Sequence, residues 1–491
     1  MARNRTPLFG PWSFYRTALG VAVPVMLQQA VMSLVSLVDN FMVAGLGDAR
    51  MAAVNVANQV NFVYFVVLFT LCGAGGIYLS QFKGAGDGEG MRQAYRFKLA
   101  ASLAVSGIWL FLTLAIPERM VALMLGGNPQ GPEIIREAAG YLRIVSIAWI
   151  PMAVSTSIAT GLREIGRARP PLYISVAATL VNTFFNWLLI YGSLGAPRLG
   201  VNGAAIATVI ARLVEFAAFL VFIRVDRTVF IPKLRELARV NLKLFVEVVR
   251  KSGPMLLSET TWVVSETVIT ALYNGRGGAE VVAGMAAGWT IANVFFLVFT
   301  GIHTATGVTV GGSLGADRLD EARDRARWIQ SGAVVAGAAL GALEALSTLG
   351  IPIVFGNLSA DAREVSRGLL FVISAYLPLW ALLNAQFAVS RAGGDTMMGM
   401  VVDVGVNLLL FLPGAFALAF LTAIGPVPMF AILKTTDFVK WLAAWLWLRG
   451  ERWVRNLTRE HAAMQPGPGV EAEAIAAVGA GTAAGAVTAA D

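Results

Sequence analysis

Long apolar stretches separated by short polar segments make up most of this chain. A membrane-spanning helix needs about 20 mostly apolar residues in a row, and about twelve stretches of the sequence reach that length. They lie near residues 17–40, 49–78, 92–117, 134–161, 170–194, 200–224, 245–274, 279–312, 326–355, 363–391, 396–423 and 425–449. The pattern predicts an all-α integral membrane protein with about twelve transmembrane helices.

The two halves of the chain repeat each other. Pro24 precedes Gly47 by 23 positions in the first half, and Pro254 precedes Gly277 by 23 positions in the second. Related halves are common in transporters, because a central site between them opens to alternate sides when one half rocks against the other. The repeat predicts two related six-helix lobes and makes transport the first hypothesis.

The basic residues orient the predicted helices in the membrane. If the amino terminus is cytoplasmic, the loops and tails on that side hold about 27 of the 38 Lys and Arg residues, and the opposite loops hold about seven. We therefore expect a multi-pass protein of the cell membrane with both termini in the cytoplasm. The Ala/Gly-rich end of the tail is expected to be disordered. The predicted domains are a cytoplasmic amino-terminal segment (1–16), the first lobe (17–224), a cytoplasmic linker (225–244), the second lobe (245–449) and a cytoplasmic tail (450–491).

Composition excludes several classes of protein. A mean hydropathy of +0.68 and a charged fraction of 14% do not fit a soluble globular protein. The net charge of +8 belongs to loops that meet anionic lipid, so we expect membrane lipid and no nucleic acid as a partner. The chain has one cysteine, two histidines and no phosphate-binding loop motif, so we expect no disulfide, metal site, cofactor or enzymatic activity. Such a transporter would use an ion gradient or run passively.

Asp39 is the clearest ionisable residue inside an apolar stretch. A carboxylate at membrane depth is costly unless it faces water, finds a partner or binds a proton. Asp39 is therefore a candidate proton or cation site near the outer half of the first helix. The alternative is a polar residue at the outer membrane interface, although the sequence after it continues apolar.

Amide side chains on nearby helices accompany this carboxylate. Asn182 and Asn186 are four positions apart and share one face of the fifth predicted helix. Asn55 and Asn58 make the second helix unusually polar, and Gln29 lies on the first. These residues are candidates to line an aqueous pocket in the first lobe. The alternative is that they only form hydrogen bonds between helices.

Acidic and amide residues also occur in the second lobe. Glu259 and Glu266 are seven positions apart on the seventh helix, and Asp403 and Asn407 are four apart on the eleventh. Asn384 lies on the tenth helix. Together they are candidates for a matching polar chamber that binds substrate. The alternative is that they only tie helices seven and eleven together.

Three further charged residues have less specific interpretations. Arg212 and Glu215, three positions apart on the sixth helix, are expected to pair with each other. Arg143 is interpreted either as a partner of a buried acid or as a side chain that reaches the lipid headgroups.

A series of motifs spans both halves and resembles a known family. The motifs are Asp39 with VAGLG after it, SQFKGAGD (80–87), GLREIGRARPP (161–171), PRLGVNGAAIATVIA (197–211) and SRAGGDT (390–396). Their order and spacing resemble those of a multidrug and toxic-compound extrusion (MATE) transporter. The resemblance implies twelve helices in two six-helix lobes, arranged as an outward-opening V. It also implies export of organic compounds in exchange for protons or sodium ions.

The resemblance assigns roles to some residues. Asp39 matches the family's first-helix aspartate, which is protonated or binds a cation, and Asn182 matches a polar residue of the same cluster. Asn186 lies where the DinF-like branch often has a second aspartate, which favours a proton site over a sodium site. The NorM-like branch uses carboxylates on helices seven and ten, whereas helix ten here offers Asn384 and Gln386. The resemblance therefore favours proton coupling over sodium coupling.

These inferences predict an antiporter that exports small organic compounds, often cationic or amphiphilic, and acts as a monomer. Protonation of Asp39 from outside would remove its charge, let the first helix repack and expel the substrate. Met26, Met32, Met42 and Phe65 are candidates for a tolerant apolar wall, with ordinary packing as the alternative.

Two rival functions stay open. A lipid or lipid-linked oligosaccharide flippase of the same wider superfamily would show a basic central cavity, whereas the intramembrane charges here are mainly acidic. A membrane enzyme acting on polyprenyl lipids would need acidic or His-rich loops to hold a metal and diphosphate. The loops here are short and basic.

Overall fold

A computed structural model of the 491-residue chain describes residues 7–125, 131–232, 234–237 and 241–459. This part of the chain is helical and contains no β-strand, which confirms the predicted all-α class. The first lobe consists of α1 (Trp12–Ala44), α2 (Asp48–Ala85), α3 (Gly88–Ala115), α4 (Pro117–Leu125), α5 (Gly131–Val145), α6 (Trp149–Glu164), α7 (Arg169–Tyr191) and α8 (Val201–Asp226). The second lobe consists of α9 (Leu242–Asn274), α10 (Ala279–Phe295), α11 (Leu297–Thr306), α12 (Gly312–Gly315), α13 (Leu319–Ser347), α14 (Ile351–Val354), α15 (Ala360–Ala392), α16 (Met397–Gly399), α17 (Leu412–Leu421), α18 (Pro426–Lys434) and α19 (Thr436–Arg449).

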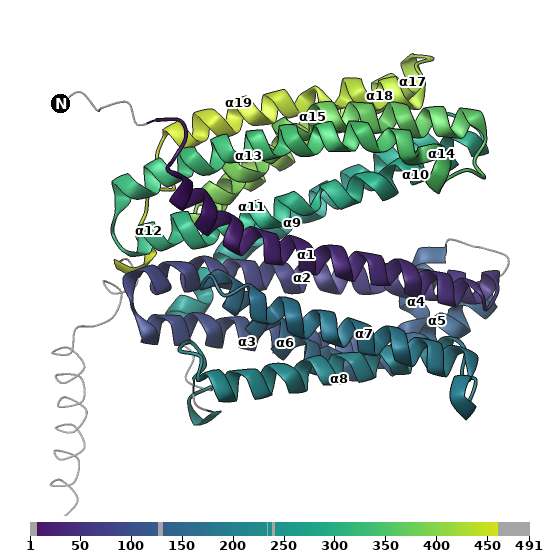
Figure 1. The fold of residues 1–491 in the computed structure, drawn as a ribbon, viewed down its shortest axis with the longest axis horizontal. Coiled ribbons are helices and arrows are strands. Elements are labelled where there is room, and N and C mark those ends of the chain that lie inside the picture. The colour runs from purple at the N-terminus through teal and green to yellow at the C-terminus, as the bar shows by residue number, and fades with distance from the viewer. Residues whose placement is uncertain (1–6, 126–130, 233, 238–240, 460–491) are drawn as a thin grey trace, which may run out of the picture.

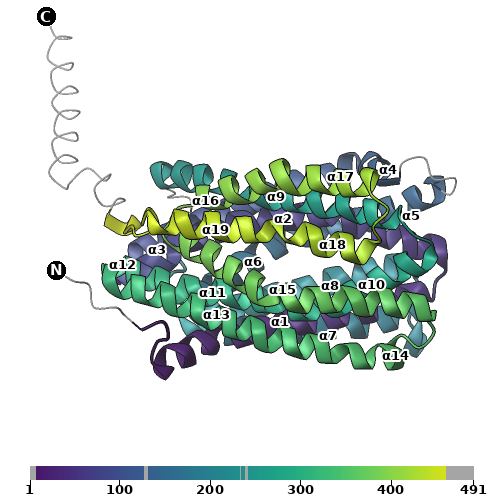
Figure 2. The same cartoon turned by 90° about the horizontal axis from the view of Figure 1, so that it is seen from above.

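Ten of the described helical stretches are long and apolar enough to cross a membrane. The other two predicted spans are α9 and the pair α18–α19. Their charged residues include Glu259, Glu266, Lys434, Asp437 and Lys440, which the apolar pattern partly hides. Both spans run alongside the other helices of the second lobe (Figure 2). Their charges therefore lie inside a helical bundle, where each one needs a partner.

The two lobes form a V, as the family resemblance implied. Figure 1 shows them converging where α12 approaches α2 and diverging toward the end that holds α4 and α14. At the junction, a Cβ atom on Gly84 or Gly315 would overlap the backbone of Gly312 or Gln81. Glycine allows this approach because it has no side chain. The converging end of the V is therefore closed by direct backbone packing.

A carboxyl-terminal strap, residues 450–459, crosses the same junction. Gln81 of α2 is fully buried, and its Nε2 donates to the carbonyl of Ala392 at 2.8 Å. Its Oε1 accepts a hydrogen bond from the backbone N–H of Leu457 at 2.8 Å. Leu457 packs in a buried cluster of the first lobe, and Trp453 packs in a cluster of the second. The strap thus belongs to both lobes, while residues 460–491, where we predicted disorder, lie outside the described residues.

We predict that Gly315→Ala lowers the thermal stability of the purified protein. The added methyl group must push α12 away from α2, and overpacking of this kind costs about 1–3 kcal/mol. Gly107→Ala in α3 is the matched control, because its Cβ would meet no atom within 4 Å. A melting curve in detergent should shift down for Gly315→Ala only. Equal curves for the two variants would contradict close backbone packing at the junction.

Candidate functional site

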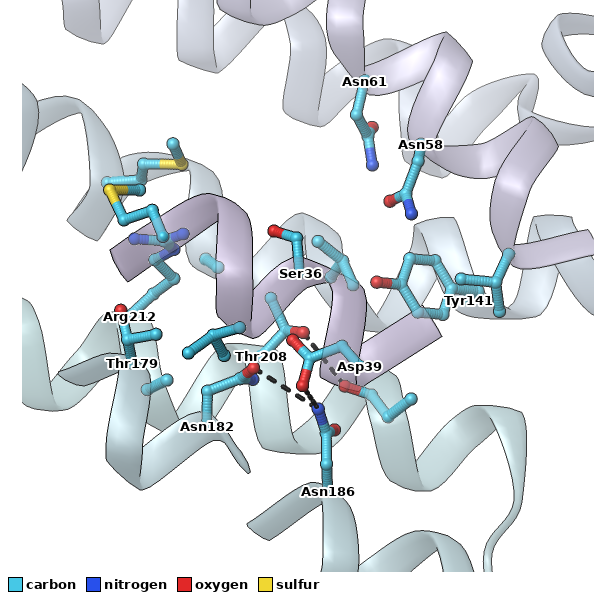
Figure 3. Close-up of a pocket in the computed structure, with 18 of the residues that line it drawn as sticks. Ser36, Asp39, Asn58, Asn61, Tyr141, Thr179, Asn182, Asn186, Thr208 and Arg212 are labelled. Carbon is cyan, nitrogen blue, oxygen red and sulfur yellow. Dashed lines mark hydrogen bonds between the residues drawn. The ribbon is translucent and has the colours of Figure 1, made fainter. Parts of the chain in front are cut away.

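A cavity of about 410 Å³ lies inside the first lobe, between α1, α2, α5, α6, α7 and α8 (Figure 3). Its polar lining comes from Ser36, Asp39, Asn40, Asn58, Asn61, Tyr141, Thr179, Asn182, Asn186, Thr208 and Arg212. Its apolar lining includes Met32, Phe62, Phe65, Trp149 and Met152. A mostly apolar pocket with a few converging polar groups is the usual form of a small-molecule site.

Asp39 is held in this cavity by Asn186, which in turn contacts Asn182, the other predicted amide. Asn186 Nδ2 donates to Asp39 Oδ1 at 2.8 Å and to Asn182 Oδ1 at 3.3 Å. The arrangement follows from sequence, since Asn182 and Asn186 are one helical turn apart on α7 and face α1. Both N–H groups of the Asn186 amide therefore donate hydrogen bonds, and one of them donates to the carboxyl group of Asp39. A donated hydrogen bond stabilises the carboxylate, so protonation of Asp39 would weaken the contact between α1 and α7.

The predicted wall of the pocket is present in part. Met32 and Phe65 line the cavity, whereas Met42 packs in a hydrophobic cluster of the first lobe. Met26 packs against α11 of the second lobe, where it lies over Gly301. Trp149 also lines the cavity. The Tyr64 ring supports it, with a distance of 4.8 Å between the two ring centroids.

Two other predicted pocket residues do not line this cavity. Asn58 is among its lining residues, but Asn55 and Gln29 are not, and both are exposed. Arg143 is bonded to the carboxylate of Glu118 and not to Asp39. Glu118 is an exposed acid, so the interpretation of Arg143 as the partner of a buried acid is wrong.

A buried polar chain extends from the cavity through the first lobe. Arg212 Nη1 donates to Glu215 Oε2 at 2.7 Å, which confirms the predicted pair. Ser175 Oγ donates to Glu215 Oε1 at 2.9 Å and accepts from Gln28 Nε2 at 2.7 Å. Arg163 Nη2 donates to Gln28 Oε1 at 2.8 Å. Each of these hydrogen bonds pairs a donor with an acceptor. The chain therefore gives buried polar groups the partners that lipid cannot provide.

Sequence reasoning chose Gln29 on α1 and missed Gln28. A signal was available, because Gln28 precedes Asp39 by eleven positions, which is close to three full turns of a helix. Gln28 therefore shares the face of α1 that carries Asp39, and it is 3% exposed. Gln29 points one residue further round the helix and is exposed.

Two of the second-lobe candidates, Glu266 and Asp403, are paired with lysines. Lys434 Nζ donates to Glu266 Oε1 at 2.9 Å, and Lys440 Nζ donates to Asp403 Oδ1 at 2.8 Å. Ser258 of α9 also donates to Asp403, at 3.0 Å. The predicted tie between helices seven and eleven thus involves Ser258 in place of a glutamate. The lysines of the last span, which sequence reasoning overlooked, provide the positive charges that these two acids need inside the bundle.

The other second-lobe candidates occupy separate positions. Glu259 Oε1 accepts from Arg391 at 3.1 Å, at the end of α15 that lies near the junction. Asn384 Oδ1 lies 3.1 Å from His303 Nε2. Asn407 is 3% exposed, and its Nδ2 has no partner among the described residues. These three side chains therefore do not join the Glu266 and Asp403 pairs in one hydrogen-bonded site.

The sequence and fold are similar to those of known transporters. A family model described as MatE matches residues 24–188 and 254–417. A probable multidrug resistance protein NorM of Bradyrhizobium diazoefficiens is 29% identical over 439 residues, which cover 86% of this chain and 90% of the relative. A probable multidrug resistance protein YoeA of Bacillus subtilis is 25% identical, with 84% and 88% covered.

Solved structures share the arrangement of helices. An outward-facing multidrug resistance MATE family transporter of the MOP superfamily superposes with a TM-score of 0.76 at 20% identity, covering 91% of this chain and 97% of the other. A variant of the Vibrio cholerae MATE transporter VcmN superposes with a TM-score of 0.79 at 17% identity, covering 90% and 99%. At these identities the likeness establishes the fold.

We predict that Gln28→Ala destabilises the protein and that Gln29→Ala does not. Removing the buried Gln28 amide takes away the acceptor of Arg163 Nη2 and the donor to Ser175 Oγ, and a buried group that loses its partner costs about 1–3 kcal/mol. Thermal unfolding of the two purified variants, compared with the unmodified protein, tests the difference between neighbouring glutamines. A larger loss for Gln29→Ala would contradict the assigned face of α1.

Proposed function

Since this chain belongs to the MatE family, we propose that it is a cell-membrane antiporter that exports small organic compounds in exchange for protons. The relatives named as multidrug resistance proteins support efflux of several compounds by one carrier. The observation that carries the proposal is the position of Asp39 in the first-lobe cavity. There a membrane-depth carboxyl faces amides and aromatic rings, and no Lys or Arg is bonded to it among the described residues.

An acid without a basic partner can serve two ligands in turn. In its charged form Asp39 attracts an organic cation, and the apolar wall provides contact area for an amphiphile. In its protonated form it loses that attraction and the bond from Asn186, so α1 can repack and the substrate leaves. Proton and substrate then compete for one group, which is the requirement for exchange.

The outward direction of the V follows from charge. The end at which the lobes converge carries loops and helix ends that are rich in Lys and Arg, including Arg163, Arg167 and Arg391. Such loops are retained in the cytoplasm, so the diverging end opens to the outside. Both termini are then cytoplasmic, because α1 begins, and α19 ends, at the converging end (Figure 1).

A flippase for an anionic lipid is less well supported. Such a carrier would need basic side chains free to bind phosphate groups. Lys434, Lys440 and Arg212 lie inside the lobes, but each is already bonded to a carboxylate at 2.7–2.9 Å. These three basic groups are thus neutralised within the protein.

We predict that Asp39→Asn abolishes proton-driven efflux and preserves the folded protein. The amide keeps the shape of the side chain but cannot bind and release a proton. Uptake of a fluorescent organic cation into inside-out vesicles under an imposed pH gradient should fall at least tenfold, to the level of empty vesicles. Asp48→Asn, at the exposed start of α2, is the matched control and should transport normally. Normal rates in Asp39→Asn would refute the assignment of Asp39.

We also predict that protons, and not sodium ions, drive transport. Asn186 provides an amide where a second carboxylate would complete a cation site, and Asp39 is the one carboxylate of the cavity lining. A pH gradient without sodium should therefore support substrate accumulation in the same vesicles. A sodium gradient at constant pH, with the proton gradient collapsed, should give none, and accumulation under that condition would overturn proton coupling.

A further inference from the structure

The ammonium group of Lys434 lies in a cage of aromatic rings and one acid. Its Nζ is 5.6 Å from the ring centroid of Trp380, 5.1 Å from that of Phe411 and 5.2 Å from that of Phe430. The same Nζ donates to Glu266 Oε1 at 2.9 Å. We call these four groups the ammonium cage. They are Trp380 of α15, Phe411 of the π-helical segment Asn407–Phe411, Phe430 of α18 and Glu266 of α9.

The cage has the chemistry of an organic-cation site. Aromatic faces attract a cation within about 6 Å of the ring centroid, and several rings around one centre recognise ammonium ligands. Phe411 and Phe430 are 3% and 0% exposed, so they are fixed by packing. The Glu266 side chain keeps 23% of its surface exposed, against 11% for Lys434, so the acidic side of the cage is more accessible than the lysine.

We propose that the ammonium cage is a second binding site for organic ammonium ions, which Lys434 fills from inside the protein as a tethered cation. The proposal rests on the function proposed above, in which organic cations are among the substrates. A ligand would enter past Glu266 and displace the lysine, whose flexible four-carbon chain lets its head group move.

The surrounding charges favour this exchange. Lys434 is attracted by Asp437 and Asp403 in addition to Glu266. Asp437 follows Lys434 by three positions, and its carboxylate accepts from Trp380 Nε1 at 2.8 Å and lies 3.6 Å from Lys440. A displaced Lys434 therefore has a second acid within one helical turn.

The charge balance of this group leaves room for one more cation. Three carboxylates, Glu266, Asp403 and Asp437, face two ammonium groups, Lys434 and Lys440. With all five groups ionised, the net charge is −1. Entry of one monovalent organic cation would bring the cluster to neutrality in a medium where unbalanced charge is costly.

Binding of benzyltrimethylammonium to the purified protein, measured by isothermal titration calorimetry without any ion gradient, tests the proposal. Lys434→Met empties the cage while keeping its apolar contacts, and the affinity should rise at least tenfold, which corresponds to about 1.4 kcal/mol. Lys434→Arg keeps a cation in place and should give no gain. A Trp380→Leu change added to Lys434→Met should remove the gain.

Lys440→Met is the matched control. It removes the same charge from the same cluster but leaves Lys434 in the cage, so the affinity should change less than about twofold. An equal gain in Lys440→Met would show that the overall charge, and not the cage, attracts the ligand. No gain in folded Lys434→Met would also overturn the proposal.

A second measurement applies if Lys434→Met does not fold. In a Cys72→Ala background, Lys434→Cys carries the only thiol of the chain. Modification with aminoethyl methanethiosulfonate restores an ammonium group and should weaken ligand binding, whereas the neutral methyl reagent should not. An equal effect of both reagents would refute the tethered-cation role.

Failure of this proposal is distinguishable from failure of the proposed function. Asp39→Asn should lose efflux but keep the cage affinity, because Asp39 lies in the other lobe. Unchanged cage affinity in Lys434→Met, with normal efflux, would remove the second site and leave the antiporter intact.

Discussion

Ionised side chains inside a membrane protein need partners within the protein, because lipid offers neither counter-ions nor hydrogen bonds. The two lobes meet this constraint in different ways. In the second lobe, Glu266 and Asp403 are bonded to lysines of the last span at 2.9 and 2.8 Å. In the first lobe, Asp39 has only an amide partner and faces a cavity. Asp39 is therefore the acid to which the proposed exchange assigns the proton.

The two lobes differ in the partners of their acids although they are built from related halves of the sequence. The Pro24 and Pro254 helices occupy corresponding places in their lobes, and each carries an acidic residue after its proline. Asp39 follows Pro24 by 15 positions, and Glu266 follows Pro254 by 12. What differs is the last helix of each half: α8 supplies Arg212, which pairs with its own neighbour Glu215, whereas α18 and α19 supply lysines that reach across to other helices. The same fold thus holds an acid without a basic partner in one lobe and acids paired with lysines in the other.

The sequence allows prediction of the features that depend on local pattern. Twelve apolar stretches and the repeat predicted the two lobes, and helical spacing put Asn182 and Asn186 on one face, where Asn186 contacts Asp39. Partners contributed by distant segments could not be predicted in this way. The contact between Glu266 and Lys434 joins residues 168 positions apart, and the contact between Gln28 and Ser175 joins residues 147 positions apart. Packing between helices decides both, and hydrophobic periodicity contains little information about it.

The carboxyl-terminal strap places a late part of the chain inside an early part of the fold. Leu457 fills a position in the first-lobe cluster beside residues such as Tyr78 and Phe97, which the ribosome produces more than three hundred residues earlier. The packing of the first lobe at the junction is therefore incomplete until Leu457 has been added to the chain. A chain truncated before the strap would leave an unfilled hydrophobic position beside Tyr78 and Phe97.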